Sequence, residues 1–175
     1  MAGLSYSSKA VTQSKLFFAT DTGKISFPLI YHMPNAQWNL VITEPGHLIY
    51  KRNPVVDSRG DSVIAAIMLY SENATAYKKD VALFWSKKMQ PLTDRGVKAV
   101  QVLSWQNKDY PLSMKNAIFV KGTYTARDLD HIIYMIYIID QHNNGLQVYL
   151  DMTTEIEKTY GNEFWDVIRS LKEIQ

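Results

Sequence analysis

The chain has 175 residues, of which 46% are hydrophobic and 21% charged, and its formal net charge is +2. This is the composition of an ordinary globular protein. The small charge argues against a dedicated nucleic-acid-binding protein, so no nucleic acid is expected among its partners. The chain contains no cysteine, which excludes disulfides, thiol catalysis and thiolate metal sites.

The N-terminal stretch MAGLSYSSKAVTQSKLFF is polar and rich in serine. It lacks the basic region followed by an apolar region that marks a secretory signal. Residues 1–14 are expected to form a flexible tail, and residues 15–175 a single domain. A chain without cysteine suits a bacterial periplasmic or secreted protein whose signal peptide is absent from this sequence, and a cytoplasmic location is the alternative.

The first half of the chain predicts three strands followed by a helix. Segments rich in β-branched and aromatic residues, bounded by turn residues, are found at 24–31, 37–52 and 62–71. Apolar side chains then recur along one side of a helix predicted over 74–92. They are Tyr77, Val81, Phe84, Trp85 and Met89. Pro91 is expected to end this helix.

Two alternating segments, 97–105 and 116–126, predict further strands and lead to the apolar run HIIYMIYII. A membrane-spanning helix needs about 20 apolar residues, so the run is too short for a helical anchor and no transmembrane segment is expected. Its β-branched and aromatic content favours a strand, and its lack of alternation predicts burial on both faces. Because Asn144-Gly145 favours a tight turn, a hairpin is expected, with strands near 131–141 and 146–151.

The chain ends with a second predicted helix, over 161–174. Its amphipathic pattern is the cleanest in the sequence. The apolar positions are Phe164, Val167, Ile168, Leu171 and Ile174. Asn162 is expected to cap its N-terminus, and Thr154 and Glu157, spaced as a capping box, are expected in a short turn before it.

The predicted order of elements contains few strand–helix–strand units, which disfavours a doubly wound parallel sheet. The fold class is therefore predicted to be α+β. We expect a central, mostly antiparallel sheet of about six to eight strands with helices packed on its faces. No internal repeat or linker divides the sequence.

Two stretches, HMPNAQWNLV and GLQVYLDMTTEIEKTYGNEFWDVIRSLKEI, resemble the PsbP-like family over roughly residues 24–175. That family includes the extrinsic protein of photosystem II, related bacterial envelope proteins and a Ran-GTPase release factor. The resemblance implies an α/β/α sandwich and a role in binding or assisting other proteins without catalysis. No functional residue of the family is carried over to a position here.

No arrangement of residues predicts a metal or a cofactor. The four histidines are His32, His47, His131 and His142, and the last two stand at opposite ends of the predicted strand at 131–141. Ends of such a strand lie about 30 Å apart, so the segments DLDH and DQH cannot share one ion. The sequence also lacks a nucleophile motif and a phosphate-binding loop. The tripeptide Arg59-Gly60-Asp61 is interpreted as a turn.

Aromatic residues give the remaining functional signal, with eleven Tyr, six Phe and four Trp. Tyr and Trp are enriched at protein interfaces. Trp38, Trp105, Tyr110 and Trp165 are the candidates for exposed, partner-binding side chains. The predicted function is a non-catalytic protein-binding or accessory role, in a bacterial envelope or secretion-related system. Two alternatives stay open: a small hydrolase or metal-dependent enzyme whose site is assembled from distant strands, and a carrier of small apolar ligands.

Overall fold

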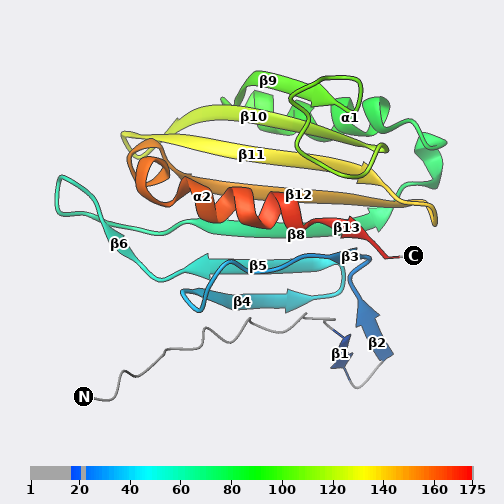
Figure 1. Ribbon diagram of the computed structural model, residues 1–175, viewed down its shortest axis with the longest axis horizontal. Coiled ribbons are helices and arrows are strands. Elements are labelled where there is room, and N and C mark those ends of the chain that lie inside the picture. The colour runs from blue at the N-terminus through cyan, green and yellow to red at the C-terminus, as the bar shows by residue number, and fades with distance from the viewer. Residues whose placement is uncertain (1–16, 21–22, 175) are drawn as a thin grey trace, which may run out of the picture.

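A seven-stranded sheet forms the centre of the protein in the computed structural model, which describes residues 17–20 and 23–174. The expected tail at 1–14 lies outside these residues. The strand order is β4-β5-β8-β12-β11-β10-β9, and every neighbouring pair is antiparallel (Figure 1). The strands are β4 (Trp38–Glu44), β5 (His47–Arg52), β8 (Ala66–Asn73), β9 (Lys98–Ser104), β10 (Ala117–Ala126), β11 (Leu129–Ile139) and β12 (Asn144–Thr153).

Short strand pairs and two helices complete the fold. The pairs are β1 (Phe17–Thr20) with β2 (Gly23–Ser26), β3 (Leu29–Ile30) with β13 (Lys172–Glu173), and β6 (Val55–Val56) with β7 (Ser62–Val63). Helix α1 (Val81–Asp94) packs on β10 and β11, and α2 (Thr154–Ser170) packs on β11 and β12. Figure 1 shows the helices on opposite faces of the sheet. The predicted α+β sandwich is confirmed. Within the described residues, no helix is long and apolar enough to cross a membrane.

Strand β11 is buried from Ile132 to Ile139, as its unbroken apolar run predicts. Successive side chains of a strand point to opposite faces. One set therefore enters the core beneath α2, and the other enters the core beneath α1. The first set is Ile132, Tyr134, Ile136 and Ile138, and the second is Ile133, Met135, Tyr137 and Ile139. The run lacks alternation because both faces of this strand are covered.

The first helix begins seven residues later than predicted and ends two residues later. It begins at Val81, where the Asp80 carboxylate caps it by accepting from the Leu83 N–H at 2.9 Å. The preceding residues form a 3-10 turn, η1 (Thr75–Tyr77), and two lysines with positive φ. Pro91 does not end the helix, which continues to Asp94. Pro91 is exposed, so water can satisfy the carbonyl left without a helical N–H.

The second helix begins at Thr154, seven residues before the predicted start, and Thr153 rather than Asn162 caps it. Glu155 and Glu157 lie in its first turn, where acidic side chains interact favourably with the helix dipole. The predicted start was late because Gly161 reads as a boundary in the sequence. In the structure Gly161 lies inside the helix, and an added Cβ would come within 3.0 Å of the Glu157 carboxylate.

The hairpin between β11 and β12 is confirmed, but the role predicted for Gly145 is wrong. The residue with positive φ in the turn is Asn143, and the Asp140 carboxylate fixes the turn by accepting the N–H groups of His142 and Asn144, both at 2.8 Å. Gly145 already belongs to β12. A Cβ there would lie 2.8 Å from the buried ring of Phe84 on α1, so packing, not turn geometry, requires glycine.

Candidate functional site

Trp38, one of the four candidate binding aromatics, is buried, so the expectation that it is exposed is wrong. Its side chain is 7% exposed and packs against Phe164 of α2. Its indole N–H donates to a carboxylate oxygen of Glu163 at 2.7 Å. This hydrogen bond satisfies the polar atom that would otherwise favour an exposed position. Trp38 therefore belongs to the contact between β4 and α2.

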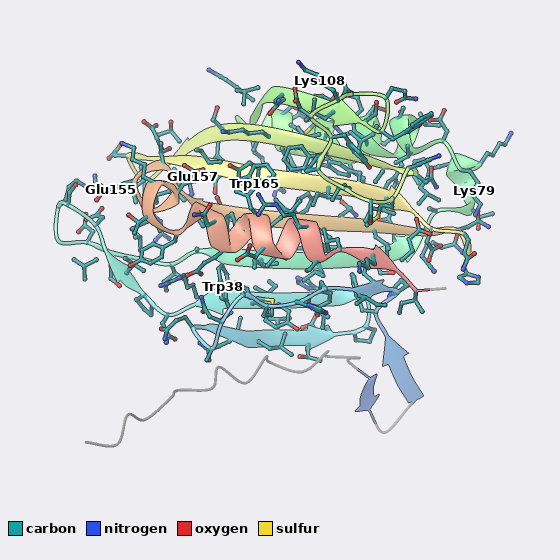
Figure 2. The ribbon with its side chains drawn as sticks, viewed as in Figure 1. Trp38, Lys79, Lys108, Glu155, Glu157 and Trp165 are labelled. Carbon is teal, nitrogen blue, oxygen red and sulfur yellow. The ribbon has the colours of Figure 1, made fainter. Side chains whose placement is uncertain are left out.

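Trp165 and Tyr110 are half-buried and have structural partners. Trp165 projects from α2, labelled in Figure 2, and stacks on Phe119 of β10, with ring centres 5.8 Å apart. The Tyr110 hydroxyl donates to the Met114 carbonyl at 2.6 Å. Both side chains pack against the core beneath α2, which leaves only part of each ring available to a partner.

Trp105 is the candidate that lies open to solvent, with 51% of its surface exposed. It directly follows β9, and the ammonium group of Lys115 lies 5.3 Å from its ring centre. An ammonium at this distance interacts favourably with the face of an aromatic ring. The ring of Trp105 thus has a charged neighbour but is not covered by the core.

Strand β9 is an edge of the sheet, and it is far more exposed than its alternating sequence predicts. All five residues from Lys98 to Val102 are exposed, Val100 to 57% and Val102 to 40%. Helix α1 packs on β10 and β11 rather than on this edge, and a bulge at Val100 interrupts the register with β10. We call residues 98–105 the β9 surface. Sequence reasoning missed Val100 and Val102 because alternation does not reveal which strand lies at an edge.

The chain segment that contains β9 is rich in basic residues. Residues 95–115 carry four basic side chains, Arg95, Lys98, Lys108 and Lys115, against one acidic side chain, Asp109. This segment alone is therefore more positive than the whole chain, whose net charge is +2. Lys108 projects at the β9 end of the molecule (Figure 2). The surface thus combines exposed apolar side chains, one open Trp and a local excess of positive charge.

A second cluster joins three polar side chains at the far end of the sheet face that α1 covers. Asp151 of β12 accepts from the Tyr124 hydroxyl at 2.7 Å, and its other oxygen lies 3.1 Å from Nδ1 of His131. Burial raises the pKa of Tyr124 far above its usual range, and the Asp151 carboxylate raises it further. Tyr124 therefore stays a hydrogen-bond donor. The neighbouring groove, about 520 Å³ in volume, is also lined by Lys98 and Asp130.

The pairing of His131 with Asp151 was not predicted, because the residues lie twenty positions apart and meet only through the pairing of two strands. The register of β11 against β12 brings the two together. His142 lies in the turn after the opposite end of β11. In the part of the chain that the structure describes, no three His, Asp or Glu side chains gather as metal ligands would.

The Arg-Gly-Asp tripeptide lies in a turn, as interpreted from the sequence. Gly60 has a φ of 85°, and the Arg59 guanidinium lies 3.3 Å from carboxylate oxygens of both Asp57 and Asp61. Ser58 donates its backbone N–H and its hydroxyl to Glu155 of α2, at 2.6 and 2.8 Å. The turn is therefore fastened to the start of α2, and its arginine is already paired.

No family model matches the chain, and no curated protein matches its sequence. Solved structures with a similar fold include the Ran-binding protein Mog1p of Saccharomyces cerevisiae. Mog1p is 10% identical with a TM-score of 0.57, and the match covers 85% of this chain and 91% of Mog1p. The Pseudomonas aeruginosa protein PA94, of unknown function, is 10% identical with a TM-score of 0.55, over 91% of this chain and 97% of PA94.

LpqN of Mycobacterium tuberculosis, a protein involved in cell envelope biogenesis, is 12% identical with a TM-score of 0.51. That match covers 84% of this chain and 83% of LpqN. At such identities the likeness is one of fold alone. The chain has the fold of Mog1p, as the resemblance implied, and its membership of the PsbP-like family stays a prediction.

Proposed function

We propose that this protein is a non-catalytic binding protein that recognises another protein through the β9 surface. The observation that carries the proposal is the gathering of exposed apolar side chains there. Among the described residues, seven large hydrophobic side chains are exposed, and three of them, Val100, Val102 and Trp105, fall within six consecutive residues. Exposed apolar side chains that lie close together along an edge strand favour an interaction site, and Trp is a frequent carrier of binding energy.

The fold relatives support a binding role by their own descriptions, since Mog1p binds Ran and LpqN takes part in envelope biogenesis. We infer further that the partner belongs to a bacterial envelope or secretion-related system. This inference rests on the chain without cysteine and on the likeness to LpqN. Fractionation of the native host would test it, since recovery of the protein with cytoplasmic markers would contradict it.

Trp105→Ser is expected to reduce capture of the native partner at least tenfold while leaving the fold intact, because an exposed interface Trp commonly contributes more than about 2 kcal/mol to binding. Capture is measured by quantitative pull-down from the native host, with circular dichroism as the check on folding. Leu83→Ser is the matched control, since Leu83 is exposed to 42% but lies on α1, away from β9. Equal capture by the two variants would remove the β9 surface as the site.

General-base catalysis at His131 is a second candidate function, favoured by the orientation of its ring. A carboxylate on Nδ1 leaves Nε2 of a histidine free to accept a proton, and positioned bases accelerate proton transfer by about 10²–10⁴-fold. The protein would then hydrolyse an activated ester such as p-nitrophenyl acetate at least 10²-fold faster than His131→Ala does. Equal rates in a stopped assay would eliminate this candidate.

Three grooves formed by residues that the structure describes do not favour the carrier alternative. They are open, and polar or charged side chains contribute to the lining of each. An apolar ligand is held instead in a concave site lined mainly by hydrophobic and aromatic side chains.

A further inference from the structure

The backbone of β9 has a short free edge with defined limits. At one end, the Val97 N–H donates to the Leu92 carbonyl at 3.0 Å. At the other end, the Ser104 N–H donates to the Asn107 side chain, and the Ser104 carbonyl accepts the Asn107 N–H, both at 2.8 Å. Residues 98–103 lie between these two anchors, and β10 is the one strand paired with them among the residues described.

The hydrogen bonds of Ser104 show which way this edge faces. In an antiparallel ladder, the N–H and C=O groups of one residue point to the same side, and those of the next residue point to the other. Because both groups of Ser104 bond to Asn107, outside the ladder with β10, the groups of Val102 also point outward. Val102 is therefore placed to exchange two hydrogen bonds with an added strand.

The bulge at Val100 limits what can pair here. A bulge bends the strand and interrupts its ladder, which discourages unselective pairing of edges. It leaves a stretch centred on Val102 as the acceptor. The side chains along and beside that stretch are apolar at Val100, Val102 and Trp105, and basic at Lys98, in the same strand, and at Lys115, beside Trp105.

We propose that an extended, acidic segment of a partner protein adds to β9 as an eighth strand of the sheet. Its backbone pairs with Val102, its apolar side chains lie on Val100 and Trp105, and its carboxylates face Lys98 and Lys115. This inference rests on the β9 surface being the binding site, and it specifies both the geometry and the charge of the partner. Strand addition supplies affinity through main-chain hydrogen bonds, and alternate side chains supply selectivity.

The test uses a capped eight-residue peptide of alternating valine and glutamate, titrated to 1 mM while backbone amide signals are recorded by NMR. The expected result is a shift of residues 98–105 and at least tenfold slower exchange of the Val102 amide. The same peptide with lysine in place of glutamate is expected to bind at least tenfold more weakly, and added salt should narrow that difference because it screens exposed charges.

Two variants separate strand addition from side-chain contact. Val102→Pro removes the outward N–H, and proline at such a position is tolerated in an edge strand. Val102→Ala removes most of the side chain but keeps the N–H donor. Val102→Pro is expected to bind the acidic peptide at least tenfold more weakly than Val102→Ala. If Val102→Pro does not fold, the exchange rate of the Val102 amide in the wild type decides the question.

Equal binding by the two variants, or no slowing of the Val102 amide, would overturn strand addition while leaving protein recognition by Trp105 intact. The absence of binding by the acidic peptide would overturn the inference as well. So would stronger binding of the lysine peptide or of an oligothymidylate of similar length, because either would show that the charge or the class of the partner is wrong. Failure of the proposed function itself is read separately, from the pull-down with Trp105→Ser.

Discussion

Leu171→Ala is expected to lower the free energy of unfolding by about 2–5 kcal/mol, the usual range for deleting a buried leucine side chain. Leu171 is 1% exposed and belongs to the core beneath α2. It is not on the helical face where the sequence pattern placed it. It follows Ser170, the last residue of α2, as an extended capping residue, and its side chain enters the core at the point where the chain turns into β13.

Lys172→Ala is the matched control, because Lys172 is the next residue and is exposed. Its backbone pairs with Ile30 of β3, and alanine preserves that pairing. We expect a change within about 0.5 kcal/mol, as for other surface substitutions. Urea titrations of both variants give the measurement. Small, equal changes would mean that the end of α2 is not docked on the sheet.

Glu163→Ala is expected to cost about 3 kcal/mol, because it leaves a largely buried arginine without its partner. Arg52 of β5 is 9% exposed, and its Nε and Nη2 atoms each lie 3.0 Å from a carboxylate oxygen of Glu163. Trp38 donates to the same carboxylate, and Tyr160 lies beneath the guanidinium, 4.0 Å from it to the ring centre. Thermal and urea unfolding measure the loss.

Asp166→Ala provides the comparison for this ion pair on the same helix. Asp166 lies 3.8 Å from Arg169, and both side chains are more than 60% exposed. Solvent screens such pairs, so Asp166→Ala should change the free energy of unfolding by close to zero. If removal of Glu163 cost no more than removal of Asp166, the contact between β5 and α2 would not depend on the buried pair.

The stabilisation by Glu163 should also depend on pH. Burial by itself raises the pKa of Glu163, but the hydrogen bonds from Arg52 and Trp38 outweigh it and hold the pKa below its usual range. Because the pKa of Glu163 is lower in the folded state, its ionised form stabilises the protein at pH values above the unfolded-state pKa of about 4.3. This stabilisation is lost as the pH falls through the folded-state pKa. The wild type should therefore exceed Glu163→Gln in stability at pH 7, and the gap should close toward pH 3. A gap independent of pH would contradict the ionised pairing.

The local pattern of the sequence determined most of the secondary structure and the fold class. The apolar run of β11, the hairpin to β12 and most of the apolar side of each helix follow from side-chain periodicity, which depends on neighbours along the chain. The exceptions are Tyr77, which precedes α1, and Leu171 and Ile174, which follow α2. Helix boundaries were less accurate. Capping depends on single hydrogen bonds, such as those made by Asp80 and Thr153, and several residues in each segment were equally suited to make them.

The tertiary structure alone decided the candidate site. Trp38 and Trp105 both stand beside a strand end in the sequence, yet α2 covers the first, while the second lies beside an uncovered edge. Val100, Val102 and the His131–Asp151 pair were missed for the same reason. Exposure of a strand and contact across a sheet depend on the order in which strands assemble and on where each helix packs. Those arrangements join residues distant in the chain, and local periodicity carries no record of them.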